Sequence, residues 1–236
     1  MLAVTTCQDS ITIVTPERAG ATTAPRGTTP RSIQRMTFSC RAIAALSLIG
    51  LAGFATAQDK PEGGFVQLFN GKDLSGWKTH PDDKAKWEVE DGAIKGTGPA
   101  GHLFTERDDF TDLVYRIEAK ISDKGNSGQY FRVKYAKAFP PGFEAQINST
   151  GSDKVKTGSL YNVVKVYDIL VPPNTWFVQE VTAKGNHIVI KVNGKVTVDT
   201  KVTDPKFDFT KGHLAIQQHD PGSTVWVRKV EVKEIK

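Results

Sequence analysis

Residues 187–201 read HIVIKVNGKVTVDTK, and this stretch decides the fold class. Two runs rich in β-branched residues, 187–192 and 195–201, flank Asn193-Gly194, a dipeptide that favours a type I′ turn between antiparallel strands. The stretch therefore predicts a β-hairpin. Turn chemistry of the same kind recurs at residues 90–92 and 184–186.

Short β-branched and aromatic runs continue through the rest of the chain, with turn residues between them and almost no helical periodicity. Evenly spaced strands of this kind indicate an antiparallel sandwich or barrel. We therefore expect a single all-β domain over residues 65–236. The expected strands are 65–69, 87–89, 93–95, 113–121, 129–135, 143–148, 162–167, 176–183, 187–192, 195–201, 213–218 and 224–234.

The composition is that of an ordinary globular chain, with 236 residues, 39% of them hydrophobic and 24% charged. A formal net charge of +5 would suggest a nucleic acid or an anionic membrane as a partner. Residues 1–57, however, hold five arginines against two acidic residues and supply +3, which leaves +2 for the 179 residues after them. We therefore expect neither a nucleic acid nor a membrane as a partner of the mature domain.

An apolar run, AIAALSLIGLAGFATA, occupies residues 42–57, follows Arg41 and ends in small residues. This pattern is typical of a secretory signal peptide, which we place at residues 36–57. The run is shorter than the roughly 20 apolar residues of a membrane span. We therefore predict an exported protein, periplasmic or secreted, whose mature chain begins at Gln58.

The flanks of this signal complete the predicted domain organisation. Residues 1–35 show no helical or strand period, so they are expected to be disordered or to precede a true start at Met36. Residues 58–64 are a polar linker. Both cysteines, Cys7 and Cys40, precede the mature chain, which excludes disulfides and cysteine chemistry from it.

Strand alternation brings polar and aromatic side chains to one face of the predicted sandwich. In residues 143–148, Glu144 and Gln146 point away from the apolar set, because successive side chains of a strand lie on opposite faces. Residues 129–135 and 213–219 alternate in the same way. The expected face consists of Tyr130, Arg132, Lys134, Glu144, Gln146, Asn148, Ala215, Gln217 and His219.

The chain resembles the 3-keto-disaccharide hydrolase family in five motifs that occur in the expected order. They are LFNGKDLSGW (68–77), NSGQYFR (126–132), GFEAQ (142–146), TGSLY (157–161) and GHLAIQQH (212–219). The resemblance covers residues 65–236 and implies a concanavalin-like jelly-roll β-sandwich of two antiparallel sheets. It also implies that the substrates are glycosides already oxidised to a ketone at sugar carbon 3. Such substrates are cleaved by elimination across carbons 1 and 2, followed by hydration of the 2-hydroxy-3-keto-glucal.

This chemistry needs a base near carbon 2, polarisation of the ketone and a proton donor for the departing oxygen. We expect Glu144 and His219 to share the roles of base and acid, in an order that the sequence leaves open. Arg132 is expected to stabilise the developing enolate. The residues expected to bind the sugar through amides or ring faces are Gln146, Gln217, Tyr130 and Tyr161.

The remaining histidines show no metal-ligand spacing, and they are expected to be solvated or locally hydrogen-bonded. They are His80, His102, His187 and His213. We therefore predict no metal among the site residues, no cofactor, and a 3-keto-sugar substrate as the partner; whether the fold binds a cation and the oligomeric state are left open.

Three other functions compete with this prediction. A non-catalytic carbohydrate-binding module would use the same face without a reactive base. A retaining glycosidase needs two carboxylates about 5 Å apart, but Gln146 stands where the partner acid of Glu144 would be. A structural adhesion module would bind without any dependence on sugar.

Overall fold

The hairpin predicted at residues 187–201 forms one edge of a β-sheet, as strands β10 (His187–Val192) and β11 (Lys195–Lys201). Asn193 and Gly194 have φ angles of 48° and 80°, the positive values that a type I′ turn requires. The computed structural model describes residues 62–235, so the predicted segments 1–35 and 36–57 lie outside the described residues.

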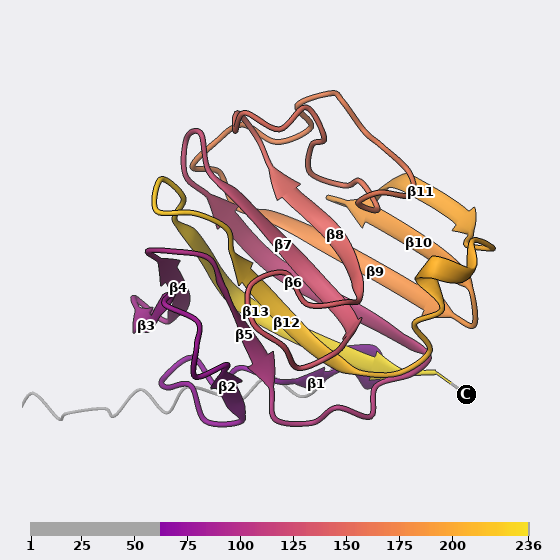
Figure 1. Cartoon of the computed structure of the whole chain (residues 1–236), viewed down its shortest axis with the longest axis horizontal. Helices are drawn as coiled ribbons and strands as arrows, with labels where there is room; N and C mark the ends of the chain where they lie inside the picture. The colour runs from indigo at the N-terminus through magenta and orange to yellow at the C-terminus, as the bar shows by residue number, and fades with distance from the viewer. Residues whose placement is uncertain (1–61, 236) are drawn as a thin grey trace, which may run out of the picture. The chain divides into compact units, whose positions relative to one another are not determined.

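Two antiparallel sheets make up the described fold (Figure 1). The other strands are β1 (Val66–Gln67), β2 (Trp77–Thr79), β3 (Lys86–Glu90), β4 (Ala93–Thr97), β5 (Gly101–Thr105), β6 (Leu113–Ile121), β7 (Asn126–Val133), β8 (Phe143–Asn148), β9 (Phe177–Lys184), β12 (His213–Gln218) and β13 (Val225–Glu234). The eight-stranded sheet has the order β11-β10-β9-β6-β13-β4-β3, with β1 also paired to β13, and the five-stranded sheet has the order β2-β5-β12-β7-β8. Two short 3₁₀ turns, η1 (Glu62–Gly64) and η2 (Pro205–Phe207), complete the elements, and no helix in residues 62–235 is long and apolar enough to cross a membrane. The predicted all-β sandwich is confirmed.

One predicted strand is wrong. Residues 162–167 turn back on themselves, because Asn162 has a φ of 61° and both Val163 and Val164 donate their N–H groups to the carbonyl of Leu160. Two strands that the sequence did not predict, β2 and β5, pair with each other, and β5 also pairs with β12.

Apolar side chains from both sheets fill the space between them. In β6, buried and part-exposed residues alternate along the whole strand, and Tyr115 and Ile117 have no exposed surface. Phe131, Ile147 and Ile216 extend from the five-stranded sheet into the same core. Burying a large apolar side chain contributes about 1.5–3 kcal/mol, so this layer dominates the stability of the fold.

Four strands of the five-stranded sheet are buried on both faces, and only β2 at its edge is partly exposed. Every residue of β5, β7, β8 and β12 is buried, whereas one face of β6 and β9 stays partly exposed. Connecting loops contribute Phe139, Tyr161 and Phe207 over the second face, where they surround a hollow. The polar face predicted from alternation therefore exists, but loops cover it, so it is not an open surface.

A β-bulge interrupts the alternation of β7 at Arg132. Arg132 has a φ of 50°, and the pairing with β12 shifts there, so that Ala215 lies opposite Tyr130 but His213 lies opposite Val133. Two residues of β7 thus oppose one of β12. Val133 consequently joins Tyr130 in a small apolar cluster on the second face, and Arg132 leaves that face.

Candidate active site

A hollow of about 430 Å³ lies over the second face of the five-stranded sheet. Its floor is formed by side chains from three neighbouring strands and the residue after β12, namely Asn126, Tyr130, Glu144, Gln146, Gln217 and His219. Its walls come from three loops and include Phe139, Tyr161, Phe207 and Phe209. Six of the seven predicted site residues therefore meet in one place.

Glu144 is the central acid of this hollow. Its side chain is 9% exposed, and its Oε2 accepts a hydrogen bond of 2.8 Å from the hydroxyl of Tyr130. Burial raises the pKa of Glu144 to about 8, opposed by the hydrogen bond from Tyr130 and assisted by the negative charge of Asp153. Such a carboxyl group can exchange a proton near neutral pH.

Two further residues fix the other side of this carboxyl group. The amide of Gln146, with its nitrogen toward the acceptors, donates to the carbonyl of Ser127 at 2.8 Å and to Glu144 Oε1 at 3.1 Å. Gly128 on the neighbouring strand leaves the necessary room, because a Cβ there would collide with Glu144 Oε1 and lie 2.8 Å from Cε2 of Tyr130. A glycine is thus required at position 128 by the close approach of Glu144.

Tyr130 links Glu144 to a second buried amide. Its hydroxyl accepts a hydrogen bond of 3.0 Å from Nε2 of Gln217, and Oε1 of Gln217 has no partner among the described residues. Burial and the charge of Glu144 hold the pKa of Tyr130 well above its ordinary value. The tyrosine is therefore a neutral hydrogen-bonding group throughout the working pH range.

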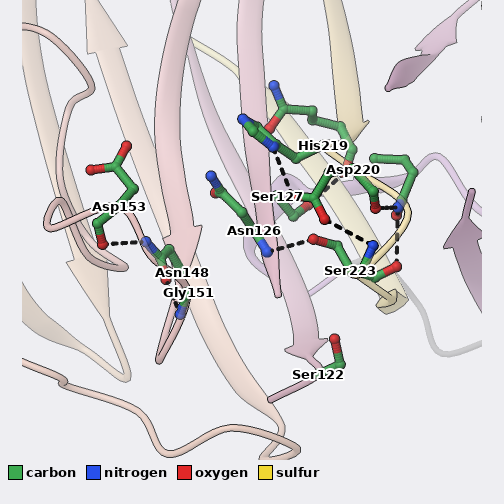
Figure 2. A network of polar contacts seen from close by, with 12 residues as sticks. Ser122, Asn126, Ser127, Asn148, Gly151, Asp153, His219, Asp220 and Ser223 are labelled. Carbon is green, nitrogen blue, oxygen red and sulfur yellow. Dashed lines mark hydrogen bonds and ion pairs between the residues drawn. The ribbon is translucent and has the colours of Figure 1, made fainter. Parts of the chain in front are cut away.

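His219 lies at the rim, on the turn that follows β12. Its side chain is 35% exposed, its Nδ1 is 2.9 Å from Oδ2 of Asp220, and its ring packs against Phe139 at a centroid distance of 5.5 Å. Figure 2 shows Asn126 between this turn and the loop that carries Asp153. Asn126 is tied to the turn, since its backbone N–H donates to Ser223 Oγ at 2.8 Å (Figure 2).

Arg132 does not belong to the site, which corrects the sequence prediction. Its guanidinium donates to the carbonyls of Thr111 at 2.9 Å, Gly185 at 2.6 Å and Phe209 at 3.3 Å, and it pairs with Asp112 at 2.9 Å. The bulge in β7 turned this side chain away from the face of Tyr130. Arg132, which is 2% exposed, instead clamps three loops together at one end of the sandwich.

Tyr161 lines the wall of the hollow, and its hydroxyl donates to Asp153 Oδ2 at 3.3 Å. Burial, then the charges of Asp153 and Glu144, raise the pKa of Tyr161. In residues 62–235 no three His, Cys, Asp or Glu side chains converge as metal ligands would.

Sequence reasoning missed three residues of the site. His102 was expected to be solvated or locally hydrogen-bonded, yet it is fully buried, neither ring nitrogen has a partner among the described residues, and its ring stands edge-on to Tyr130 at 4.6 Å. Burial lowers the pKa of His102 to about 3, and the charge of His219 contributes to this fall. The nearby backbone of Ala138 acts in the opposite direction and raises the pKa. Asn126 and Gly128 were quoted only as part of a motif. Their positions, four and two residues before Tyr130, were the signal that could have placed them on its face, because every second side chain of a strand lies on the same face.

A larger hollow of about 650 Å³ lies on the outer face of the eight-stranded sheet, but its charges neutralise one another. Glu180 accepts from Arg116 at 2.9 Å and from Lys191 at 3.1 Å, while Arg116 also pairs with Glu231 at 3.5 Å. A partly exposed network of this kind is structural, and the hollow above Glu144 is the better candidate.

Comparison with known proteins identifies the family of the chain. Residues 64–233 match the family model of the 3-keto-α-glucoside-1,2-lyase-like domain. The chain belongs to this family. The matched residues include every strand from β2 to β12 and thus the whole floor of the hollow, so the resemblance found in the sequence is confirmed.

Solved structures place the family fold among carbohydrate-active proteins. A candidate glycosyl hydrolase from Parabacteroides distasonis ATCC 8503 is 25% identical, with a TM-score of 0.64 over 73% of this chain and 94% of that chain. The Bacillus licheniformis β-glucanase is 15% identical, with a TM-score of 0.54 over 74% of this chain and 100% of that chain. The carbohydrate-binding module CBM66 from Bacillus subtilis is 16% identical, with a TM-score of 0.50 over 67% of this chain and 96% of that chain. No curated protein matches the chain.

These likenesses confirm the predicted jelly-roll sandwich of two antiparallel sheets. Together with the family match, they support a carbohydrate-active enzyme.

Proposed function

We propose that this protein cleaves glycosides that carry a ketone at sugar carbon 3, by elimination across carbons 1 and 2, and then hydrates the product. The observation that carries this function is a lone buried carboxyl group, Glu144, on the floor of the hollow. The family match supports the substrate class, since the family takes its name from a 3-keto-α-glucoside 1,2-lyase.

Glu144 is assigned as the base that removes the proton from carbon 2. A ketone at carbon 3 acidifies that hydrogen, and a base is most effective when its pKa lies near the working pH. The pKa of about 8 makes ionised Glu144 a stronger base than an ordinary carboxylate. The donors Tyr130 and Gln146 hold both of its oxygens in place.

In the first step the C2–H bond breaks, its proton moves to Glu144, and its electron pair forms the enolate of the ketone. The enolate then expels the glycosidic oxygen from carbon 1 and leaves a double bond between carbons 1 and 2. In the second step water adds to carbon 1, and Glu144 returns its proton to carbon 2. One group thus serves as base and then as acid.

His219 is assigned as the proton donor to the departing oxygen. Asp220 holds its Nδ1 at 2.9 Å, which leaves Nε2 for the substrate. With Arg132 engaged elsewhere, the side-chain amide of Asn126 on the floor is assigned to the ketone oxygen.

Ordinary glycoside hydrolysis fits this site less well. It uses two carboxyl groups, one on each side of the bond. Of the described residues that line the hollow, Glu144 alone carries a carboxyl group. Elimination needs only one.

The test is product analysis with a 3-keto-glucoside and its unoxidised parent glucoside. We expect the aglycone to be released from the keto form alone. Glu144→Gln should lose about 10²- to 10⁴-fold in turnover while remaining folded. The control Glu180→Gln removes a carboxyl group from the outer face and should keep its activity.

Exchange of the carbon-2 hydrogen with solvent deuterium separates the two roles. Glu144→Gln should abolish this exchange, whereas His219→Asn should slow cleavage and spare it. Equal release from both substrate forms would instead indicate conventional hydrolysis. Saturable binding of the sugar without any release would indicate a carbohydrate-binding module.

A further inference from the structure

Glu144 must exist in two protonation states during turnover, and each state needs a different hydrogen-bond environment. The ionised carboxylate only accepts hydrogen bonds, whereas the protonated acid must also donate one. A buried donor or acceptor left unpaired costs free energy that slows the step in which it appears. The groups around Glu144 must therefore satisfy both states.

The oxygen on the Gln146 side cannot accommodate this change. The Gln146 nitrogen faces two acceptors, the carbonyl of Ser127 at 2.8 Å and Glu144 Oε1 at 3.1 Å. Turning this amide over would set its oxygen against the Ser127 carbonyl. Gln146 is consequently locked as a donor, and Oε1 remains an acceptor in both states.

The oxygen on the Tyr130 side faces a chain that can be reversed. Tyr130 donates to Glu144 Oε2 at 2.8 Å and accepts from Gln217 Nε2 at 3.0 Å. Gln217 is 1% exposed, and its amide makes this one side-chain hydrogen bond among the described residues, because Oε1 has no partner. Half a turn of the amide would present Oε1 to the tyrosine at the cost of no other hydrogen bond.

We propose that Tyr130 and Gln217 form a reversible hydrogen-bond chain that serves Glu144 in both of its protonation states. With Glu144 ionised, Gln217 donates to Tyr130 and Tyr130 donates to Oε2. With the substrate proton on Oε2, Glu144 donates to Tyr130, whose hydroxyl rotates and donates to Oε1 of Gln217. The two directions differ in the hydrogen positions and in the half-turn that exchanges the amide oxygen and nitrogen of Gln217, and no proton leaves Glu144 along the chain.

In this scheme Gln217 is a positioning residue that acts through Tyr130. Its importance for turnover rests on the proposed function of Glu144 as the base, but the chain itself can be tested without substrate. The titratable groups around it are Tyr161 and Asp153 from the loop after β8, His219 from the rim and His102 from β5. None of these four groups is substituted in the variants described below.

The test follows the titration of Glu144 by carbon-13 NMR of labelled glutamate carboxyl groups, with Glu144→Gln to assign the signal. Gln217→Met removes the acceptor that the protonated state needs, so the pKa of Glu144 should fall by about one unit. Tyr130→Phe removes the donor to the carboxylate, so the pKa should rise by a similar amount. The control Gln179→Met removes a buried glutamine of the other sheet, whose contacts are Gly158 and Ala145, and should leave the pKa unchanged.

The double variant makes the test specific. If Gln217 acts through Tyr130, adding Gln217→Met to Tyr130→Phe should leave the pKa of Glu144 where Tyr130→Phe alone puts it. On a 3-keto-glucoside, Gln217→Met should lose about tenfold in kcat with little change in KM.

Several results would overturn the chain. An unchanged or raised pKa of Glu144 in Gln217→Met would do so, as would an additive effect in the double variant. A rise in KM alone would make Gln217 a sugar-binding residue. If Gln217→Met does not fold, the same comparison of single and double variants can be made with Gln217→Asn and Tyr130→Phe. Inactivity of the wild-type protein on every 3-keto-glucoside would refute the proposed function, but the titrations would still decide the chain.

Discussion

Burying Glu144 should make the stability of the whole domain depend on pH, and Glu144→Gln isolates this dependence. A carboxyl group whose pKa is about 8 in the folded state and 4.5, its ordinary value, in the unfolded chain is protonated in the folded state and ionised in the unfolded state between those two pH values. The unfolded chain then binds fewer protons, so the free energy of unfolding falls as the pH rises through this window. Below this pH window Glu144 is protonated in both states, and no stability is lost.

The size of the loss follows from the shift. One pKa unit corresponds to about 1.36 kcal/mol, so the shift of Glu144 amounts to about 3–5 kcal/mol at the upper end of the window. Glutamine cannot ionise and escapes this loss. Glu144→Gln should therefore lie within about 1 kcal/mol of the wild-type stability near pH 5 and exceed it by about 3–5 kcal/mol above pH 8.

Denaturant unfolding of both proteins at about pH 5, 6.5 and 8.5 measures the difference, in which the titrations of all other groups cancel. The control is Glu180→Gln. Burial acts to raise the pKa of Glu180, but Arg116 and Lys191 outweigh it, so the pKa is lowered. Its effect on stability should vary little over this pH range, because Glu180 is ionised in the folded state and largely ionised in the unfolded chain at each of these pH values. A difference between Glu144→Gln and wild type that stays constant with pH would refute the reasoning.

Two other changes test the packing of the site. Arg132→Met leaves Asp112 and three carbonyls without their partner, so it should lower the free energy of unfolding by about 3–5 kcal/mol in denaturant unfolding. The control Arg116→Met removes a partly exposed ion pair and should cost at most about 1 kcal/mol. Wild-type stability of Arg132→Met combined with lost turnover would indicate that Arg132 takes part in the reaction. Gly128→Ala inserts a methyl group against Glu144, so it should cost about 1–3 kcal/mol and displace the carboxyl group. A Gly128→Ala variant with wild-type kcat/KM and stability would contradict that contact.

Local sequence patterns predicted the elements whose structure is itself local. The turn at Asn193-Gly194 and the bounds of β10 and β11 follow from the φ angles those residues favour, and both are confirmed. Alternation in 143–148 correctly placed Glu144 and Gln146 on one face, because β8 is a regular strand without a bulge.

The errors occur where distant parts of the chain decide the outcome. Arg132 left its expected face because β7 and β12 pair with a bulge, a property of two strands that neither sequence shows alone. His102 was expected to be solvated or locally hydrogen-bonded, but it is fully buried on β5, a strand that was not predicted and that pairs with the distant β12. The segment 162–167 has a strand-like composition, but its backbone turns at Asn162.

The residues around the hollow come from two kinds of element, buried strands and connecting loops, and these differ in how freely they can change during evolution. Glu144, Tyr130 and Gln217 stand on adjacent strands that are buried on both faces, so a change in the size of these side chains disturbs the packing around them. Phe139 and Phe207, by contrast, come from loops that only border the cavity. Such loops tolerate insertion and replacement. A lineage with this fold can therefore change which molecules the hollow admits by exchanging loops, while it keeps the buried polar groups of the floor.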